Sequence, residues 1–327
     1  MVTFPQHRLR RLRRTPALRR LVAETRLGVD DLVAPLFVRE GLDQPVPISS
    51  LPGVVQHSRS SLRAEVAELV SLGVNAVILF GIPESKDARG SGASDADGIV
   101  QVAIRELRDE FGDQIVLMAD LCLDEYTDHG HCGLLTAHGE VDNDATLERY
   151  SEVAVAQAQA GVDICAPSGM MDGQVMAIRE ALDSTGSDQV SILAYSAKYA
   201  SGLYGPFREA VDVEIADGGD RKSYQQDFHN LRESLEEIRA DLDEGADMVM
   251  VKPALTYLDV LARARFEFDV PLAAYHVSGE YAMIHAAAER GWIDGELVAL
   301  EQITAIKRAG ADFILTYFAR SLAESFQ

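Results

Sequence analysis

The stretch SLEEIRADLDEGADMVMVKPA, residues 234–254, contains the pattern that decides the fold. Leu235, Ile238 and Leu242 recur at helical spacing, which predicts a helix with one apolar face. Gly245 suits the left-handed end of that helix, and the run MVMV that follows is continuously apolar. A strand without polar alternation is typical of a parallel sheet that helices cover on both faces.

The same pattern, in which a helical stretch ends at glycine and leads into an apolar run, occurs at three further places. These are SLRAEVAELVSLGVNAVILFG (61–81), ERYSEVAVAQAQAGVDICAPS (148–168) and ALEQITAIKRAGADFILTYFA (299–319). Similar strands can be placed at residues 32–38, 115–120, 191–195 and 271–275, which brings the total to eight. Eight strands interleaved with helices over about 300 residues predict an α/β fold, a TIM (β/α)8 barrel.

A doubly wound open sheet is the main alternative to the barrel. It would usually place a glycine-rich phosphate loop after an early strand, and the sequence has none. No linker rich in Pro, Gly or Ser divides the body of the chain. We therefore expect residues 1–28 to form an extended N-terminal arm and residues 29–327 to form one TIM-barrel catalytic domain.

The two ends of the chain differ in charge. Residues 1–20 hold seven arginines and no acid, and the chain's formal net charge is −22, so setting these arginines aside leaves −29 on the remainder. Such a body would repel a nucleic-acid backbone. A nucleic-acid or membrane arm is the alternative, but we expect the arm to dock on the acidic surface of a neighbouring subunit.

Composition favours a cytoplasmic globular protein with no membrane span. The chain is 47% hydrophobic and 25% charged, and no uncharged apolar run reaches the roughly 18 residues that a membrane span requires. The arginine-rich start does not resemble a signal peptide. Three cysteines, Cys122, Cys132 and Cys165, are too few and too odd in number for a disulfide framework, which agrees with a reducing compartment.

Lysine is rare in this chain, with five among thirty basic side chains, and two of the five follow predicted strands. These are Lys198 and Lys252. Each alone is more often a solvated charge, but a lysine amine can attack a carbonyl once burial or a nearby cation lowers its pKa. Barrel enzymes place their chemistry at the C-terminal ends of strands, so the two lysines are expected at one mouth. The pair indicates covalent imine chemistry.

Other side chains with chemistry follow the remaining strands and are expected at the same mouth: Asp120, Cys122, Ser168, Ser278 and Tyr317. Between the lysines, residues 204–227 form a glycine-punctuated stretch that is too long for a simple connection and is typical of a lid. Arg208, Arg221 and Lys222 on this stretch suit a carboxylate-bearing substrate, although each alone is more often a surface charge.

The loop DLCLDEYTDHGHCGLL, residues 120–135, concentrates possible metal ligands. Cys122 and Cys132 bracket two histidines and three acids. Thiolates at this spacing favour a borderline-soft ion such as zinc. The alternative is that both cysteines are small buried hydrophobes.

Several longer motifs resemble the porphobilinogen synthase, or delta-aminolevulinic acid dehydratase, family. They are YSAKYASGLYGPFREA, GDRKSYQ, MVMVKPA, YHVSGEYAM and the loop DxCxxxYTxHGHCG, and the resemblance runs over almost the whole chain. It implies a lyase that joins two molecules of 5-aminolevulinate, with loss of two waters, to porphobilinogen for haem biosynthesis. It also implies a TIM barrel with an arm, and a homo-octamer in which the arms wrap neighbouring subunits.

The resemblance also implies a role for individual residues near the first substrate. Lys252 would form a Schiff base with that substrate, whose carboxylate would meet Ser278 and Tyr317. Lys198 would engage the second substrate.

For that second substrate, the resemblance places the carboxylate against Arg208 and Arg221 on the lid, with Gln225 nearby. Asp120 and Ser168 would line the site and place the amine and the protons.

Two features depart from the family's usual metal pattern. Zinc-dependent members carry three cysteines in the loop and magnesium-type members replace them, whereas this chain has the hybrid set Cys122, Asp124 and Cys132, which still predicts zinc. A glutamate after GDRKSYQ binds stimulatory magnesium in many members, and the register places it at Glu237. Gly169 stands where the family commonly has aspartate.

Two other hypotheses remain open at this point. A class I aldolase would also use a barrel lysine and an imine, but it needs only one such lysine and leaves the cysteine-containing loop unexplained. A non-catalytic metal-binding scaffold would account for the arm and the thiols but not for two lysines at strand ends.

Overall fold

The structure is a computed structural model that describes residues 3–215 and 219–327. Within them, eight parallel strands pair in sequence order, and the last pairs with the first through Leu32–Ile314 and Val33–Leu315. The predicted TIM barrel is therefore confirmed. Its strands are β1 (Leu32–Arg39), β4 (Ala76–Ile82), β5 (Val116–Leu121), β6 (Ile164–Pro167), β7 (Ser191–Lys198), β8 (Met248–Lys252), β9 (Leu272–His276) and β10 (Phe313–Thr316).

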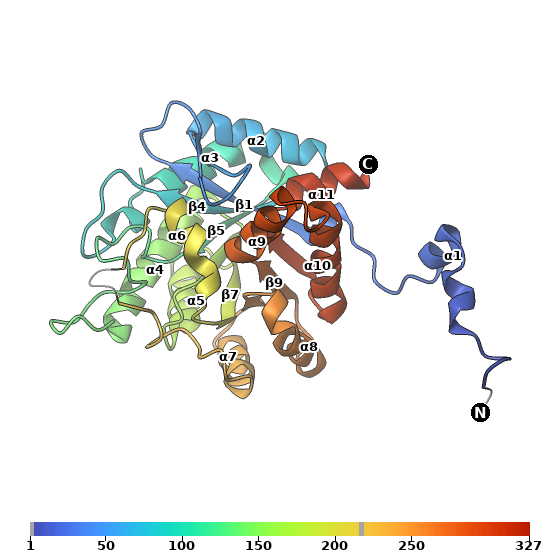
Figure 1. Ribbon diagram of the computed structural model, residues 1–327. Helices are drawn as coiled ribbons and strands as arrows, with labels where there is room; N and C mark the ends of the chain where they lie inside the picture. Colours follow the sequence, from blue (N-terminus) through green and yellow to red (C-terminus); the bar gives the residue numbers. More distant parts are fainter. Residues whose placement is uncertain (1–2, 216–218) are drawn as a thin grey trace.

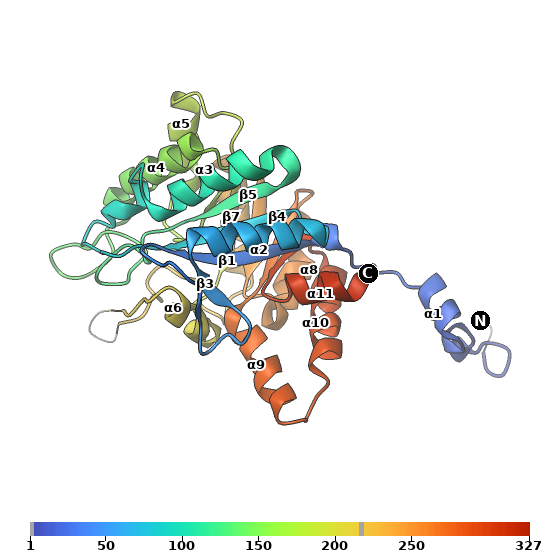
Figure 2. The same cartoon turned by 90° about the horizontal axis from the view of Figure 1, so that it is seen from above.

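Helices cover the outer face of the barrel (Figures 1 and 2). They are α2 (Arg59–Ser71), α3 (Ile99–Phe111), α4 (Asn143–Ala160), α5 (Gln174–Ser184), α7 (Arg232–Asp243), α8 (Leu258–Glu267), α9 (Ser278–Glu289), α10 (Gly295–Ala309) and α11 (Ala319–Phe326). The decisive stretch folds as predicted, because α7 buries Leu235 and Ile238 and β8 follows directly. Between them, Gly245 has a φ of 108°, the left-handed conformation that glycine allows.

The chain also contains a short hairpin that the sequence did not reveal. β2 (Val46–Pro47) and β3 (Val55–His57) pair antiparallel, and β3 adds to the edge of β1 beyond the barrel. Strands of two and three residues are too short to produce a periodic pattern. The Tyr281 hydroxyl of α9 donates a hydrogen bond to the carbonyl of Pro52, which lies between the two strands (2.5 Å). This bond ties the hairpin to α9.

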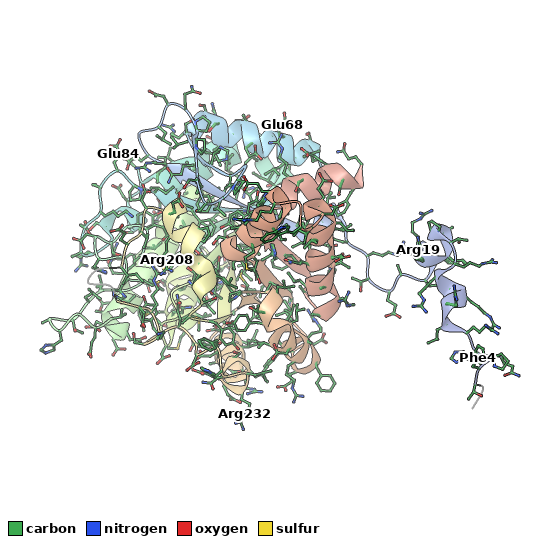
Figure 3. All side chains as sticks on the ribbon, in the orientation of Figure 1. Phe4, Arg19, Glu68, Glu84, Arg208 and Arg232 are labelled. Atoms are coloured by element: carbon green, nitrogen blue, oxygen red, sulfur yellow. The ribbon has the colours of Figure 1, made fainter. Side chains whose placement is uncertain are left out.

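Residues at the start of the chain extend away from the barrel, with η1 (Leu9–Arg13) and α1 (Pro16–Leu21) lying apart from it (Figures 1 and 2). Figure 3 shows Phe4 and Arg19 on this segment. Its apolar side chains are exposed: Phe4 by 72%, Leu9 by 69% and Leu21 by 74%. None of the helices in the described part of the chain is long and apolar enough to cross a membrane.

Candidate active site

The two lysines are neighbours at the ends of adjacent strands. Lys198 is the last residue of β7 and Lys252 the last of β8, and the two are register partners in the parallel pair. Each is only 5% exposed. The register of this pair shifts between Ala194 and Ala197, just before the lysines. The two strand-end lysines therefore lie side by side at the same end of the barrel, as predicted.

Aromatic rings surround the amine of Lys252. Its Nζ lies 4.4 Å from the ring centroid of Tyr275, 5.0 Å from Tyr195, 5.2 Å from Phe207 and 5.4 Å from Tyr204. Burial, and then the positive charge of Lys198, lower the pKa of Lys252 to about 7. A large share of this amine is therefore neutral near physiological pH, which is the form that attacks carbonyls.

Lys198 has one ring beside it, that of Tyr195 at 5.5 Å, and its hydrogen-bond partners are polar groups. Its Nζ donates a hydrogen bond to the backbone carbonyl of Ser168, and the Ser168 hydroxyl donates to Asp120 Oδ2 (3.1 Å). Burial raises the pKa of Asp120 to about 6, although the charges of Lys198 and Lys252 act to lower it. A carboxyl group with this pKa can take up and release protons near neutral pH.

A cavity of about 310 Å³ opens above the lysines. Seven of the predicted catalytic and substrate-binding residues line it, namely Asp120, Ser168, Lys198, Arg208, Arg221, Gln225 and Lys252. Arg208 comes from the short helix α6 (Gly205–Ala210) of the predicted lid stretch (Figure 3). Residues 216–218 of that stretch lie outside the described residues.

The other two predicted substrate contacts lie behind the lining of this cavity. Ser278 Oγ accepts a hydrogen bond from the Phe207 amide (3.0 Å) and donates to the Leu203 carbonyl (3.3 Å). The Tyr317 hydroxyl lies 3.2 Å from that of Tyr275, whose ring faces Lys252. Ser278 therefore contacts the backbone of the segment that carries Phe207, and Tyr317 contacts the side chain of Tyr275; neither lines the cavity above the lysines.

The predicted metal ligands converge beside the lysines. One ligand atom each from Cys122, Asp124 and Cys132 lies within 4.8 Å of the other two, and all three residues are buried. Zinc bonds to sulfur and carboxylate oxygen are about 2.0–2.3 Å long, so three ligands around one ion require this spacing. The donor set thus fits a divalent ion. Arg221 forms an ion pair with Asp124 Oδ2 (2.8 Å) and donates to the Gly130 carbonyl (2.8 Å), which ties the lid to this loop.

The charges around this cluster set the protonation of its members. Burial acts to raise the pKa of Asp124, but the charges of Arg221 and Lys198 outweigh it and hold that pKa well below the usual range. Burial also acts to raise the pKa of Cys132, and the hydrogen bond with Cys122 together with Arg221 brings it below its ordinary value. Burial raises the pKa of Cys122. The pKa values of one carboxylate and one thiol of the set are therefore shifted toward the charged form that metals bind.

Glu237, the predicted magnesium ligand, lies on α7 in a separate cavity that also contains Asp172 and Glu233. Burial and these neighbouring acids raise its pKa to about 6. The cavity shares Lys222 and Gln225 of the lid with the one above the lysines.

Sequence reasoning missed the rings around Lys252. Tyr195 and Tyr275 end two of the predicted strands, so their position was a usable signal for side chains at the mouth. Tyr204 and Phe207 belong to the lid stretch, and only the folding of α6 over the mouth brings them to the amine. Glu125, one of the three acids between the two cysteines of the loop, is buried, and burial raises its pKa well above its usual range.

A closed (β/α)8 barrel with a buried lysine pair and a cluster of two thiols and a carboxylate at its C-terminal mouth defines a class of protein, that of the (β/α)8-barrel enzymes. A partly neutral amine at this mouth is suited to Schiff-base chemistry.

Comparison with known proteins gives the particular family. The sequence profile of delta-aminolevulinic acid dehydratase matches residues 6–325. The delta-aminolevulinic acid dehydratase of Streptomyces coelicolor is 59% identical over 327 residues, covering 99% of this chain and 98% of its own. That of Mycobacterium tuberculosis is 58% identical over 321 residues, covering 98% and 97%.

A solved structure agrees with the sequence relatives. The delta-aminolevulinic acid dehydratase (porphobilinogen synthase) of Toxoplasma gondii, in complex with the reaction product porphobilinogen, superposes with a TM-score of 0.95 at 45% identity, covering 98% of this chain and 91% of that one. The chain belongs to the delta-aminolevulinic acid dehydratase family, and its function is that of this hydro-lyase in tetrapyrrole biosynthesis.

Proposed function

We propose that Lys252 and Lys198 each form a Schiff base, Lys252 with the first and Lys198 with the second of two 5-aminolevulinate molecules that are joined to porphobilinogen. The observation that carries this assignment is the pairing of the two buried lysines on β7 and β8, with the pKa of Lys252 at about 7. A class I aldolase needs one such lysine, so the pair favours a reaction with two carbonyl substrates.

Imine formation follows from the state of the Lys252 amine. The neutral nitrogen attacks the ketone carbon, a C–N bond forms, and the ketone oxygen leaves as water with two protons that derive from the amine. The imine draws electrons from the neighbouring carbon, so a base can remove a proton there and the new carbon–carbon bond can form. Asp120 and Ser168 would receive and return these protons, which is supported by the Asp120 pKa of about 6 and by the hydrogen bond between the two residues.

The substrate carboxylates require cations and hydroxyl groups. Arg208, Arg221 and Gln225 line the cavity on its lid side and would bind the carboxylate of the second substrate. Ser278 and Tyr317 would bind that of the first substrate. This assignment is supported by two contacts near Lys252. Ser278 accepts a hydrogen bond from the Phe207 amide, and the Tyr317 hydroxyl contacts that of Tyr275.

Cys122, Asp124 and Cys132 would hold a zinc ion, because their ligand atoms have the spacing and the chemistry that zinc prefers. A zinc ion held there would act as a Lewis acid and help to orient the second substrate. Glu237 would bind a magnesium ion away from the lysines, supported by its partly buried acidic surroundings.

We also propose that the protein is a cytoplasmic homo-octamer in which the N-terminal arm, residues 1–28, docks on neighbouring copies. The exposed apolar side chains Phe4, Leu9 and Leu21 support an arm that meets a partner. Its arginines and the acidic body of another copy are complementary in charge. The three free, buried cysteines agree with a reducing compartment.

Borohydride reduction in the presence of 5-aminolevulinate, followed by peptide mass spectrometry, tests the assignment. We expect a reduced substrate adduct on Lys252. Absence of any substrate adduct on Lys252 and Lys198 would overturn the Schiff-base assignment, and an adduct on Lys252 alone would remove the covalent role of Lys198.

A further inference from the structure

Tyr150 is a fully buried side chain of α4 that reaches the proposed metal ligands from outside the barrel. It is 0% exposed. Its hydroxyl donates a hydrogen bond to the Cys132 carbonyl (2.8 Å), and the same oxygen lies 3.9 Å from Cys122 Sγ. One hydroxyl group thus touches both cysteines of the cluster, which are ten positions apart in the chain.

The place of this hydroxyl depends on Gly169. A Cβ atom added at Gly169 would lie 1.6 Å from the Tyr150 hydroxyl oxygen and 2.6 Å from the ring carbon that carries it. Gly169 is not among the glycines with positive φ, so the need for glycine here is steric rather than conformational. Any side chain at position 169 would therefore displace the Tyr150 hydroxyl.

The same helix holds the next part of the loop. Thr146, one turn before Tyr150 on α4, accepts a hydrogen bond from the Leu134 amide through its hydroxyl (2.9 Å). Thr146 and Tyr150 therefore fix the loop segment that begins at Cys132 at two points. On the other side, Gly169 directly follows Ser168, whose carbonyl accepts from Lys198. The contact between Tyr150 and Gly169 thus joins the thiol loop to the strand end beside the lysines.

We propose that Tyr150 and Gly169 form an interlocked pair that positions Cys122 and Cys132 for a divalent cation. The absent side chain at position 169 makes room for the hydroxyl, and the hydroxyl sets the place of the loop that carries both thiols. This inference rests on the proposed metal site at Cys122, Asp124 and Cys132. It also gives a reason for Gly169 in place of the family's usual aspartate, since an aspartate could not coexist with the Tyr150 hydroxyl in this position.

The first test compares zinc affinity of the full-length Tyr150→Phe protein with that of the unsubstituted protein, by competition with a chromophoric chelator. Phenylalanine keeps the ring and removes only the hydroxyl. Loss of a partner that orients a metal ligand weakens binding by about 10- to 100-fold, and we expect a loss in that range. The thiolate-to-metal absorption band of the cobalt-loaded protein should also change. Tyr199→Phe is the matched control, because Tyr199 is a buried tyrosine whose hydroxyl donates to the Asn230 carbonyl at the same 2.8 Å.

The second test is a double-variant cycle that remains informative if one variant folds poorly. Gly169→Ala should weaken zinc binding about tenfold or more when Tyr150 is present. The same change combined with Tyr150→Leu should add little further loss, because the clashing ring atoms are gone. Equal losses from Gly169→Ala in both backgrounds would overturn the interlock, as would unchanged zinc affinity in Tyr150→Phe. If the unsubstituted protein binds no zinc, the metal site itself fails, which is a distinct result.

Discussion

The lysine pair and the thiol cluster lie side by side but have different supports. Lys198 and Lys252 end two barrel strands whose backbone register makes them neighbours. Cys122 directly follows β5, but Cys132 lies ten positions further on, in a loop that is held by hydrogen bonds from Tyr150 and Arg221 and by the ion pair of Arg221 with Asp124. The position of the Lys252 amine thus follows from the barrel backbone, whereas the position of Cys132 depends on individual side chains. Substitutions in the cluster should therefore leave Lys252 in place.

The largest expected effect comes from Lys252→Ala. Removing the nucleophile should lower kcat/KM by about four orders of magnitude or more and abolish the borohydride-trapped substrate adduct at that position. Lys307→Met is the control, because Lys307 pairs with Asp31 away from the cavity residues and should keep the adduct on Lys252. Full adduct yield elsewhere with normal turnover in Lys252→Ala would show that the nucleophile is misassigned.

A smaller effect is expected from replacing both thiols. The Cys122→Ala, Cys132→Ala protein should lose its bound zinc and about 100-fold of its activity. It should nevertheless still form the reduced adduct on Lys252, since the strands hold that lysine. Cys165→Ala serves as the control, because Cys165 is a buried thiol of β6 outside the cluster. If the double variant lost both its zinc and the adduct on Lys252, the position of Lys252 would depend on the cluster, which would contradict this prediction.

The lid arginine Arg208 gives the next effect in size. Arg208→Met should raise KM about tenfold with a smaller change in kcat, because a charge-assisted contact to a substrate carboxylate is removed. Arg232→Met, at an exposed residue of α7 labelled in Figure 3, is the matched control and should leave steady-state kinetics unchanged. A KM that does not move in Arg208→Met would remove this residue from the substrate contacts.

The smallest effect is a shift along the pH axis. The pKa of Lys252 is about 7, below its usual 10.5, so the rate of adduct trapping should rise as pH increases through 7 and then level off. Lys198→Met removes a positive charge that lowers this pKa, so the midpoint should move to higher pH by about one unit. The measurement is the trapping rate against pH. An unchanged midpoint would mean that burial, and not the charge of Lys198, lowers the pKa of the Lys252 amine.

The fold and the lysines were predictable because their signals are local. Continuous apolar runs after glycine-terminated helices indicated four of the barrel strands, and similar apolar runs indicated the other four. Strand order then placed Lys198 beside Lys252. The ion pair between Arg221 and Asp124 was not predictable, since it joins residues about a hundred positions apart across the lid.

The same reason applies to the details of the thiol loop. The family resemblance predicted its ligands, but the contact of Tyr150 with Gly169 depends on how a helix packs against a strand end, and no local pattern encodes that distance. The β2–β3 hairpin escaped prediction because its strands are too short to show alternation.

The aromatic rings around Lys252 also affect the lifetime of the imine that it would form. An imine reverts to ketone and amine when water reaches its carbon, so its lifetime depends on how scarce water is. Tyr275, Tyr195, Phe207 and Tyr204 surround the nitrogen at 4.4–5.4 Å, and two of them come from the lid segment. If the lid segment that carries Tyr204 and Phe207 moved away, water would reach the imine. The rate of that movement would therefore limit the lifetime of the first covalent intermediate before the second substrate binds.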